Sequence, residues 1–185
     1  MRLETHVHGY IELVEGVTRR QVETALHPLL SNQDVEHLSE LKSLEPDQPG
    51  FVFDERNYTL EMCCTLDVGS DFFQSLEEGM LALGRLVENA TAIEVIAYHD
   101  DGRDESQLMF VGPSPEAILD AQRRYMLEDV SALLSRHFKQ DAVDEVLSLV
   151  SDLFRREQQQ TSSPVEAASE QPAFHMPATP GRRLH

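Results

Sequence analysis

Hydrophobic and polar residues alternate along five segments of the chain, with the period of two that is typical of half-buried β-strands. Residues 3–13 form the first such segment. Residues 51–53 and 58–68 are separated by a polar turn, which predicts a hairpin. Residues 91–99 and 107–111 show the same arrangement and predict a second hairpin. The pattern therefore indicates five strands, three of them long.

Apolar residues recur at helical spacing in four other segments, which predicts four helices with one apolar stripe each. The first helix is expected after Thr18, which opens a capping-box pattern, and the second after Asp71. Two more are expected after Ser114, where a proline suits the first helical position, and from Asp141. Residues 34–44 have apolar positions at helical spacing within a highly polar frame, and their structure is left open.

The order of these elements is β-α-β-β-α-β-β followed by two helices. A β-α-β-β-α-β unit is the split βαβ, ferredoxin-like arrangement. We therefore predict an α+β fold with a ferredoxin-like core and an extra edge strand over residues 1–113. A C-terminal helical pair, residues 114–157, is expected to pack on or beside this core. Residues 158–185 are rich in Gln, Ser, Ala and Pro, which predicts a disordered tail.

Charge narrows the range of partners. The 185 residues include 33 Asp and Glu against 15 Lys and Arg, a formal net charge of −18. Direct nucleic-acid binding needs a basic footprint and is excluded. Residues 32–105 hold 18 acidic and 4 basic residues, so the acidity belongs to the middle of the folded part and not to the tail. A charged protein partner is therefore expected to be basic.

Hydropathy and cysteine usage bear on the compartment. No apolar run approaches the roughly 20 residues of a membrane span, and the N-terminus lacks the apolar core of a signal peptide. The two cysteines, Cys63 and Cys64, are neighbours and cannot form a long-range disulfide with each other. These features predict a cytoplasmic protein that does not bind membranes.

The candidate site lies on the sheet face that the two core helices would leave open. His6 and His8 point to this face about 7 Å apart along one strand, so a single divalent metal ion can bridge them. A carboxylate from the neighbouring strand, Glu61, is the expected third ligand. The alternative is a solvated or partner-covered polar face whose histidines bind nothing. The same face is expected to carry four further candidate binding residues: Tyr10, Cys63, Glu94 and Tyr98.

The sequence favours one function and leaves two alternatives open. The favoured function is a non-enzymatic binding or regulatory protein that acts through protein contacts, because the apolar stripe of the last helix must be buried somewhere; a homodimer is one solution. The first alternative is a divalent-metal-binding protein or enzyme that uses the His6 and His8 face. The second is an acidic inhibitor that imitates DNA at the site of a DNA-binding protein. No other cofactor is expected, since the chain has no glycine-rich phosphate loop.

Overall fold

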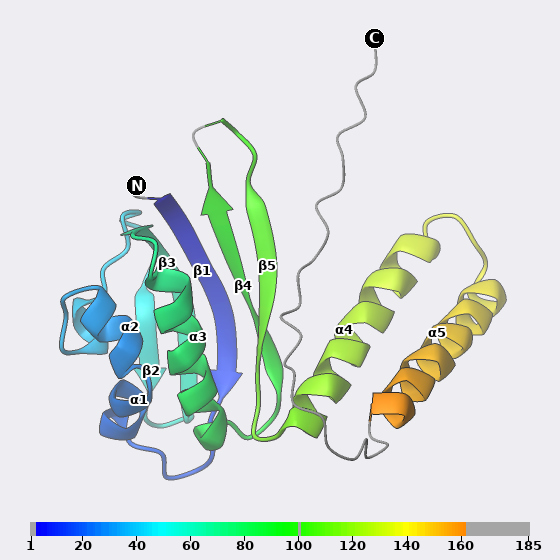
Figure 1. The fold of residues 1–185 in the computed structure, drawn as a ribbon, viewed down its shortest axis with the longest axis horizontal. Helices are drawn as coiled ribbons and strands as arrows, with labels where there is room; N and C mark the ends of the chain where they lie inside the picture. The colour runs from blue at the N-terminus through cyan, green and yellow to red at the C-terminus, as the bar shows by residue number, and fades with distance from the viewer. Residues whose placement is uncertain (1–2, 100, 162–185) are drawn as a thin grey trace, which may run out of the picture.

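The structure is a computed structural model that describes residues 3–99 and 101–161 (Figure 1). Its strands form a single antiparallel sheet in the order β2-β3-β1-β4-β5, so that β1 is the central strand. The α+β class and the five predicted strands are confirmed. The strands are β1 (Leu3–Glu12), β2 (Gly50–Asp54), β3 (Thr59–Val68), β4 (Thr91–Tyr98) and β5 (Glu105–Val111).

The helices fall into two groups (Figure 1). Three of them cover one face of the sheet, whereas the C-terminal helical pair extends beyond β5. The covering helices are α1 (Arg19–Ala25), α2 (His27–Asn32) and α3 (Phe72–Leu83); the pair consists of α4 (Pro115–Leu134) and α5 (Gln140–Thr161). Two short 3-10 turns, η1 (Leu38–Glu40) and η2 (Gly84–Leu86), complete the described elements.

The hydrophobic core lies between the sheet and the three covering helices. Val7, at the centre of β1, is opposite Cys64 on β3 and Val95 on β4, and all three side chains are buried. Phe72 and Leu76 of α3 are fully buried in the same hydrophobic cluster. The alternation seen in the sequence therefore assigns the correct face of each long strand to the core.

The first predicted helix is divided in two. Thr18 caps α1 with the expected capping box, in which its side chain accepts a hydrogen bond from the backbone of Gln21. The helix then ends at Ala25, and Pro28 stands in the first turn of α2. Proline has no N–H to continue the hydrogen-bond ladder of a preceding helix, so a new helix begins there. The open segment 34–44 contains the single 3-10 turn η1.

The helical pair packs beside the sheet. Ser114 caps α4 as expected, accepting a 3.2 Å hydrogen bond from the backbone N–H of Ala117. Tyr125 of α4 meets Phe110 of β5 edge to face, with ring centroids 5.6 Å apart. The Arg124 guanidinium donates a 3.3 Å hydrogen bond to the carbonyl of Ala90, just before β4. These contacts hold α4 against β4 and β5.

One boundary differs from expectation at the C-terminus. Helix α5 continues to Thr161, through the first four residues of the region predicted to be a disordered tail. The rest of that prediction, residues 162–185, lies outside the described residues. Within the described part of the chain, no helix combines the length and the apolar character that a membrane crossing requires.

Candidate metal centre on the open sheet face

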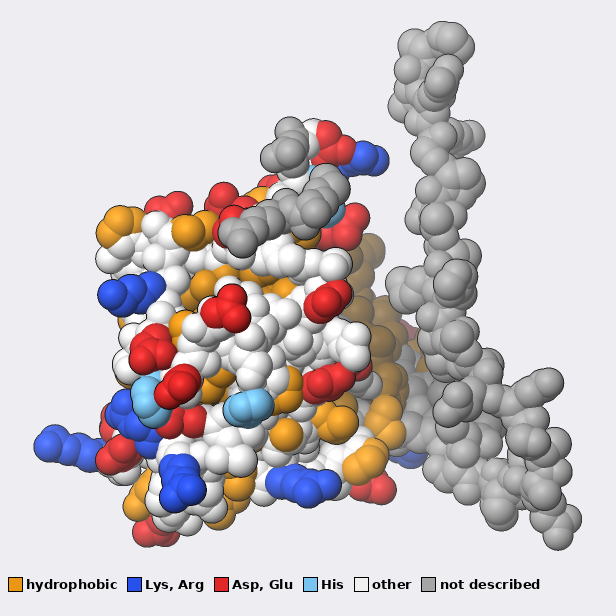
Figure 2. All heavy atoms as spheres, turned by 60° about the vertical axis from the view of Figure 1, so that its left-hand side comes forward, with side chains coloured by type: hydrophobic (Ala, Val, Ile, Leu, Met, Phe, Trp, Pro, Cys, Tyr) orange, Lys and Arg blue, Asp and Glu red, His pale blue; other side chains and the backbone are white. Residues whose placement is uncertain are grey.

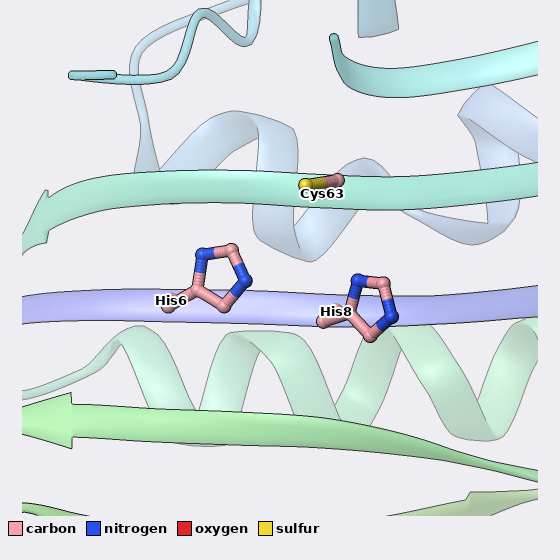
Figure 3. A group of neighbouring side chains, drawn as sticks. All are labelled: His6, His8 and Cys63. Carbon is pink, nitrogen blue, oxygen red and sulfur yellow. The ribbon is translucent and has the colours of Figure 1, made fainter. Parts of the chain in front are cut away.

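The sheet face opposite α1, α2 and α3, called the open face below, carries the polar side chains of β1. His8 lies opposite Cys63 of β3 on one side and opposite Glu94 of β4 on the other. His6 is opposite Thr65 of β3. Figure 3 shows both imidazoles and the Cys63 side chain projecting from adjacent strands, with the helices behind the sheet.

His6, His8 and Cys63 form a compact group of potential metal ligands. One ligand atom from each lies within 4.8 Å of those of the other two. The two imidazole rings are nearly parallel, with their planes 11° apart and their centroids separated by 6.1 Å. His8 is exposed, whereas His6 and Cys63 are half-buried. The group is thus reachable from solvent while two of its members are held by their surroundings.

The predicted third ligand, Glu61, occupies a different place on the same face. Glu61 lies opposite Tyr10, two residues further along the strand pair than Cys63, which lies opposite His8. It does not belong to the compact group. Cys63, which the sequence placed among the wider binding residues, takes the position beside the histidines instead. Both residues lie on the polar face of β3, so only the strand register distinguishes them.

A hydrogen-bond chain fixes the His6 ring. Its Nδ1 lies 3.0 Å from Oγ1 of Thr65, and the Thr65 hydroxyl donates to Oε1 of Gln48, also at 3.0 Å. When the Thr65 hydroxyl gives its one proton to Gln48, it accepts the proton of His6 Nδ1. The His6 Nε2 atom is then left with its lone pair, which is the form that binds a metal.

The loop before β2 holds this chain in place. Ser43 donates to Oε1 of Gln48 at 2.6 Å and accepts a 2.8 Å hydrogen bond from the backbone N–H of Thr65. The Leu44 N–H donates to the Thr65 carbonyl at 2.8 Å. As a result Thr65 is only 3% exposed, although it lies on the open face. The alternation of β3 places Thr65 on the open face, but its burial and its contact with Gln48 were not predicted, because an aperiodic loop gives no signal of what it covers.

Burial also favours the neutral form of His6. Partial burial lowers the pKa of its imidazole, and the neighbouring His8 lowers that pKa further, while the Glu94 carboxylate opposes both effects. Neutral imidazole is the form that ligates metals.

The two cysteines have opposite environments. Cys64 points into the core, and burial raises the pKa of its thiol to about 11. It therefore stays a protonated, apolar side chain. Cys63 points to the open face and is half-buried. Only Cys63 is placed to act as a ligand.

The remaining predicted face residues are spread along the sheet. Glu94 is half-buried beside His8, and its carboxylate accepts a 2.8 Å hydrogen bond from the Ser106 hydroxyl. Tyr10 is 53% exposed at one end of β1. Tyr98 lies opposite Glu4, near the other end of β1. Glu94 is thus a neighbour of the histidine pair, whereas the two tyrosines are not brought together.

These observations define an α+β protein with one open sheet face, a cluster of two histidines and a cysteine on it, and a helical pair beside it. A family model matches residues 3–155, and the chain therefore belongs to DUF6806, a family of unknown function. The match includes the sheet and most of the helical pair. Comparison with curated proteins and with solved structures found no match.

Proposed function

We propose that the protein binds a divalent transition-metal ion through His6, His8 and Cys63. The observation that carries this proposal is the approach of the three ligand atoms to within 4.8 Å of one another on adjacent central strands. Two imidazoles and a thiolate suit zinc, cobalt, nickel or copper, whereas magnesium and calcium prefer oxygen ligands.

The geometry requires only small movements. A tetrahedral zinc ion with bonds of about 2.0–2.3 Å keeps its ligand atoms about 3.5 Å apart. Rotation of the exposed His8 side chain and of the Cys63 thiol can bring the three atoms together without a change in strand register. The hydrogen bond from His6 Nδ1 to Thr65 supports the proposal, because metal-bound histidines generally donate their second N–H to a protein acceptor.

The fourth coordination position is proposed to hold water, with Glu94 nearby. One thiolate leaves a divalent ion with a net positive charge, which the Glu94 carboxylate beside His8 partly offsets. Three protein ligands and an open position are also found in catalytic zinc sites. The proposal is limited to metal binding.

Calorimetric titration of the apoprotein with zinc tests the proposal. We expect one ion per chain, with binding lost in His6→Ala/His8→Ala and in Cys63→Ser and retained in the matched control His27→Ala, which removes an exposed histidine of α2. Cobalt provides a second readout, because a thiolate ligand gives a sulfur-to-cobalt charge-transfer band that Cys63→Ser must abolish. Equal zinc binding by the wild type and these ligand variants overturns the proposal.

Glu61 enters the same experiment as an alternative ligand. If it coordinates the ion, Glu61→Gln lowers zinc affinity as strongly as Cys63→Ser does. If Cys63 is the third ligand, Glu61→Gln leaves the affinity within about twofold, the effect of an exposed charge near the site.

We also infer that residues 1–113 adopt the ferredoxin-like arrangement. The order β2-β3-β1-β4, with every neighbouring pair antiparallel and the crossing helices on one face, supports this inference. In that arrangement β5 is the added edge strand. Superposition of an experimental structure on known ferredoxin-like domains tests it.

Protein binding is the second candidate function. It is favoured by exposed apolar side chains in and between the helices of the pair, including Leu133 of α4 and Phe138 of the connecting loop at 61% and 59%. Acidic side chains are distributed among uncharged ones on the side shown in Figure 2. Imitation of DNA, a basic partner and a cytoplasmic location therefore stay predictions from charge and composition.

A further inference from the structure

Helix α5 carries two apolar stripes, and α4 covers only one of them. Val143 is fully buried, and Leu147, Val150 and Phe154 are half-buried on the same side. The second stripe lies on the adjacent side of the helix and is exposed to solvent. It consists of Val146, Leu149 and Leu153, which are 39%, 57% and 50% exposed.

The exposed stripe is symmetric about its own midpoint, which lies between Leu149 and Val150. If a second α5 is placed antiparallel against the first, Val146 meets the partner's Leu153, and Leu149 lies beside the partner's Leu149. Residues separated by three and seven positions lie along one side of a helix. The stripe is therefore complementary to a copy of itself under a twofold axis.

Charges beside the stripe show the same symmetry. Glu145 and Arg156 are both exposed and are separated by 11 residues, or about three helical turns, so they lie along one flank of the stripe. In the antiparallel pair each flank meets the same flank of the partner. Glu145 then comes close to the partner's Arg156, offset by about 3 Å along the axis. In a parallel pair each flank would instead meet the opposite flank of the partner, and Glu145 would not come close to Arg156.

The helical pair is also much less acidic than the middle of the chain, so two copies of the chain repel each other less there than at their middle regions. Residues 114–157 carry 9 acidic and 6 basic residues, whereas residues 32–105 carry 18 and 4. An apolar contact between nearly balanced segments keeps the strongly acidic middle regions apart.

We propose that α5 binds α5 of a second copy of this chain in an antiparallel, twofold-symmetric contact. The two helical pairs then form a four-helix bundle that links two sheet cores. Burial of Val146, Leu149 and Leu153 supplies the attraction, and the Glu145–Arg156 contacts set the direction. This contact is independent of the proposed metal site, which lies on the open sheet face.

Sedimentation velocity at tens of micromolar tests the proposal. The wild type is expected to be a dimer, and Leu149→Glu a monomer, because the substitution places two carboxylates at the centre of the contact. Leu81→Glu is the matched control: Leu81 is an equally apolar residue of α3 that is 77% exposed, so its variant is expected to stay dimeric. Circular dichroism checks that both variants are folded. A monomeric wild type or a dimeric Leu149→Glu overturns the proposal.

A charge exchange tests the direction of the helices. Glu145→Arg and Arg156→Glu should each weaken dimerisation about fivefold, since two exposed contacts are lost in each dimer and each contributes little. The double variant Glu145→Arg/Arg156→Glu restores opposite charges and should recover wild-type affinity. A double variant as weak as the single ones overturns the antiparallel contact.

Discussion

The sheet core and the helical pair are built from similar apolar residues but use them differently. Most fully buried side chains of the described residues belong to the core, whereas the helical pair contributes only Ala121 and Val143. The core covers its own apolar face with α1, α2 and α3. The pair leaves several large apolar side chains in solvent, among them Leu133, Leu149 and Leu153. A region that buries its own apolar surface is stable alone. The stability of a region that leaves this surface exposed depends on what it binds.

Removal of a core side chain is the strongest way to test this difference. Phe72→Ala leaves a cavity under the sheet and should lower the free energy of unfolding by about 3–5 kcal/mol. Leu133→Ala, at a site of α4 that is 61% exposed, should change it by less than about 0.5 kcal/mol. Urea denaturation measures both. Similar losses in the two variants would show that the pair is packed as tightly as the core.

Gly9 tests how closely the strands of the core approach each other. A Cβ atom at this position of β1 would lie 2.5 Å from Cγ2 of Ile93 on β4 and 3.2 Å from its Cα. Gly9→Ala should therefore destabilise the protein by about 1–3 kcal/mol through overpacking. Thermal unfolding measures the loss, and Gly69→Ala, where a Cβ meets nothing within 4 Å, is the control. An unchanged melting temperature for Gly9→Ala would show that β1 and β4 can separate freely.

A substitution of Thr65 tests whether the hydrogen bond to His6 supports the proposed metal site. Thr65→Val removes the acceptor of the His6 Nδ1 proton but keeps the size of the side chain. Zinc affinity should fall about tenfold, in the range typical of such supporting groups. Thr59→Val, at the far end of the same face of β3, should leave the affinity unchanged. Equal affinities for the wild type and Thr65→Val would assign Thr65 a packing role only.

The smallest expected effect concerns the hairpin turn between β2 and β3. The pKa of Asp54 is lowered, chiefly because its carboxylate accepts a 2.8 Å hydrogen bond from the Arg56 N–H and a second from the Asn57 amide. Since the pKa is lower in the folded state, this stabilisation is present above pH 3.8 and is lost as the pH falls through the folded pKa.

Unfolding measured from neutral pH down to about pH 3 should show the consequence. The difference in stability between the wild type and Asp54→Ala should shrink as the pH falls. A difference that stays constant over this range would mean that the carboxylate charge does not contribute to the turn.

The sequence predicts where the strands lie better than it predicts which residues face each other across paired strands. Alternation identifies β1, β3 and β4 and assigns their buried faces, because one residue of slip would expose the whole apolar row. It does not determine which residue of β3 lies opposite His8. That register is set by the pairing of β1 with β3, which are far apart in the chain, and by packing, so Glu61 was expected where Cys63 lies.

The support of the site was beyond sequence analysis for a different reason. Thr65 alternates like an exposed residue and is buried by the loop that contains Ser43 and Gln48. That loop begins inside the segment 34–44, whose pattern was ambiguous. Residues without a period give no indication of where their side chains lie, so a hydrogen-bond chain built from them is visible only in three dimensions.

Cys63 and Cys64 point to opposite faces of the sheet, so the reactivity of the two thiols reports whether the chain is folded. A thiol reagent at neutral pH should count one reactive sulfur in the folded protein, because Cys64 is completely buried and Cys63 is not. Unfolding should raise that count to two. An ion held by Cys63 would lower it towards zero, so a single titration of sulfur separates the unfolded, the folded and the metal-bound chain.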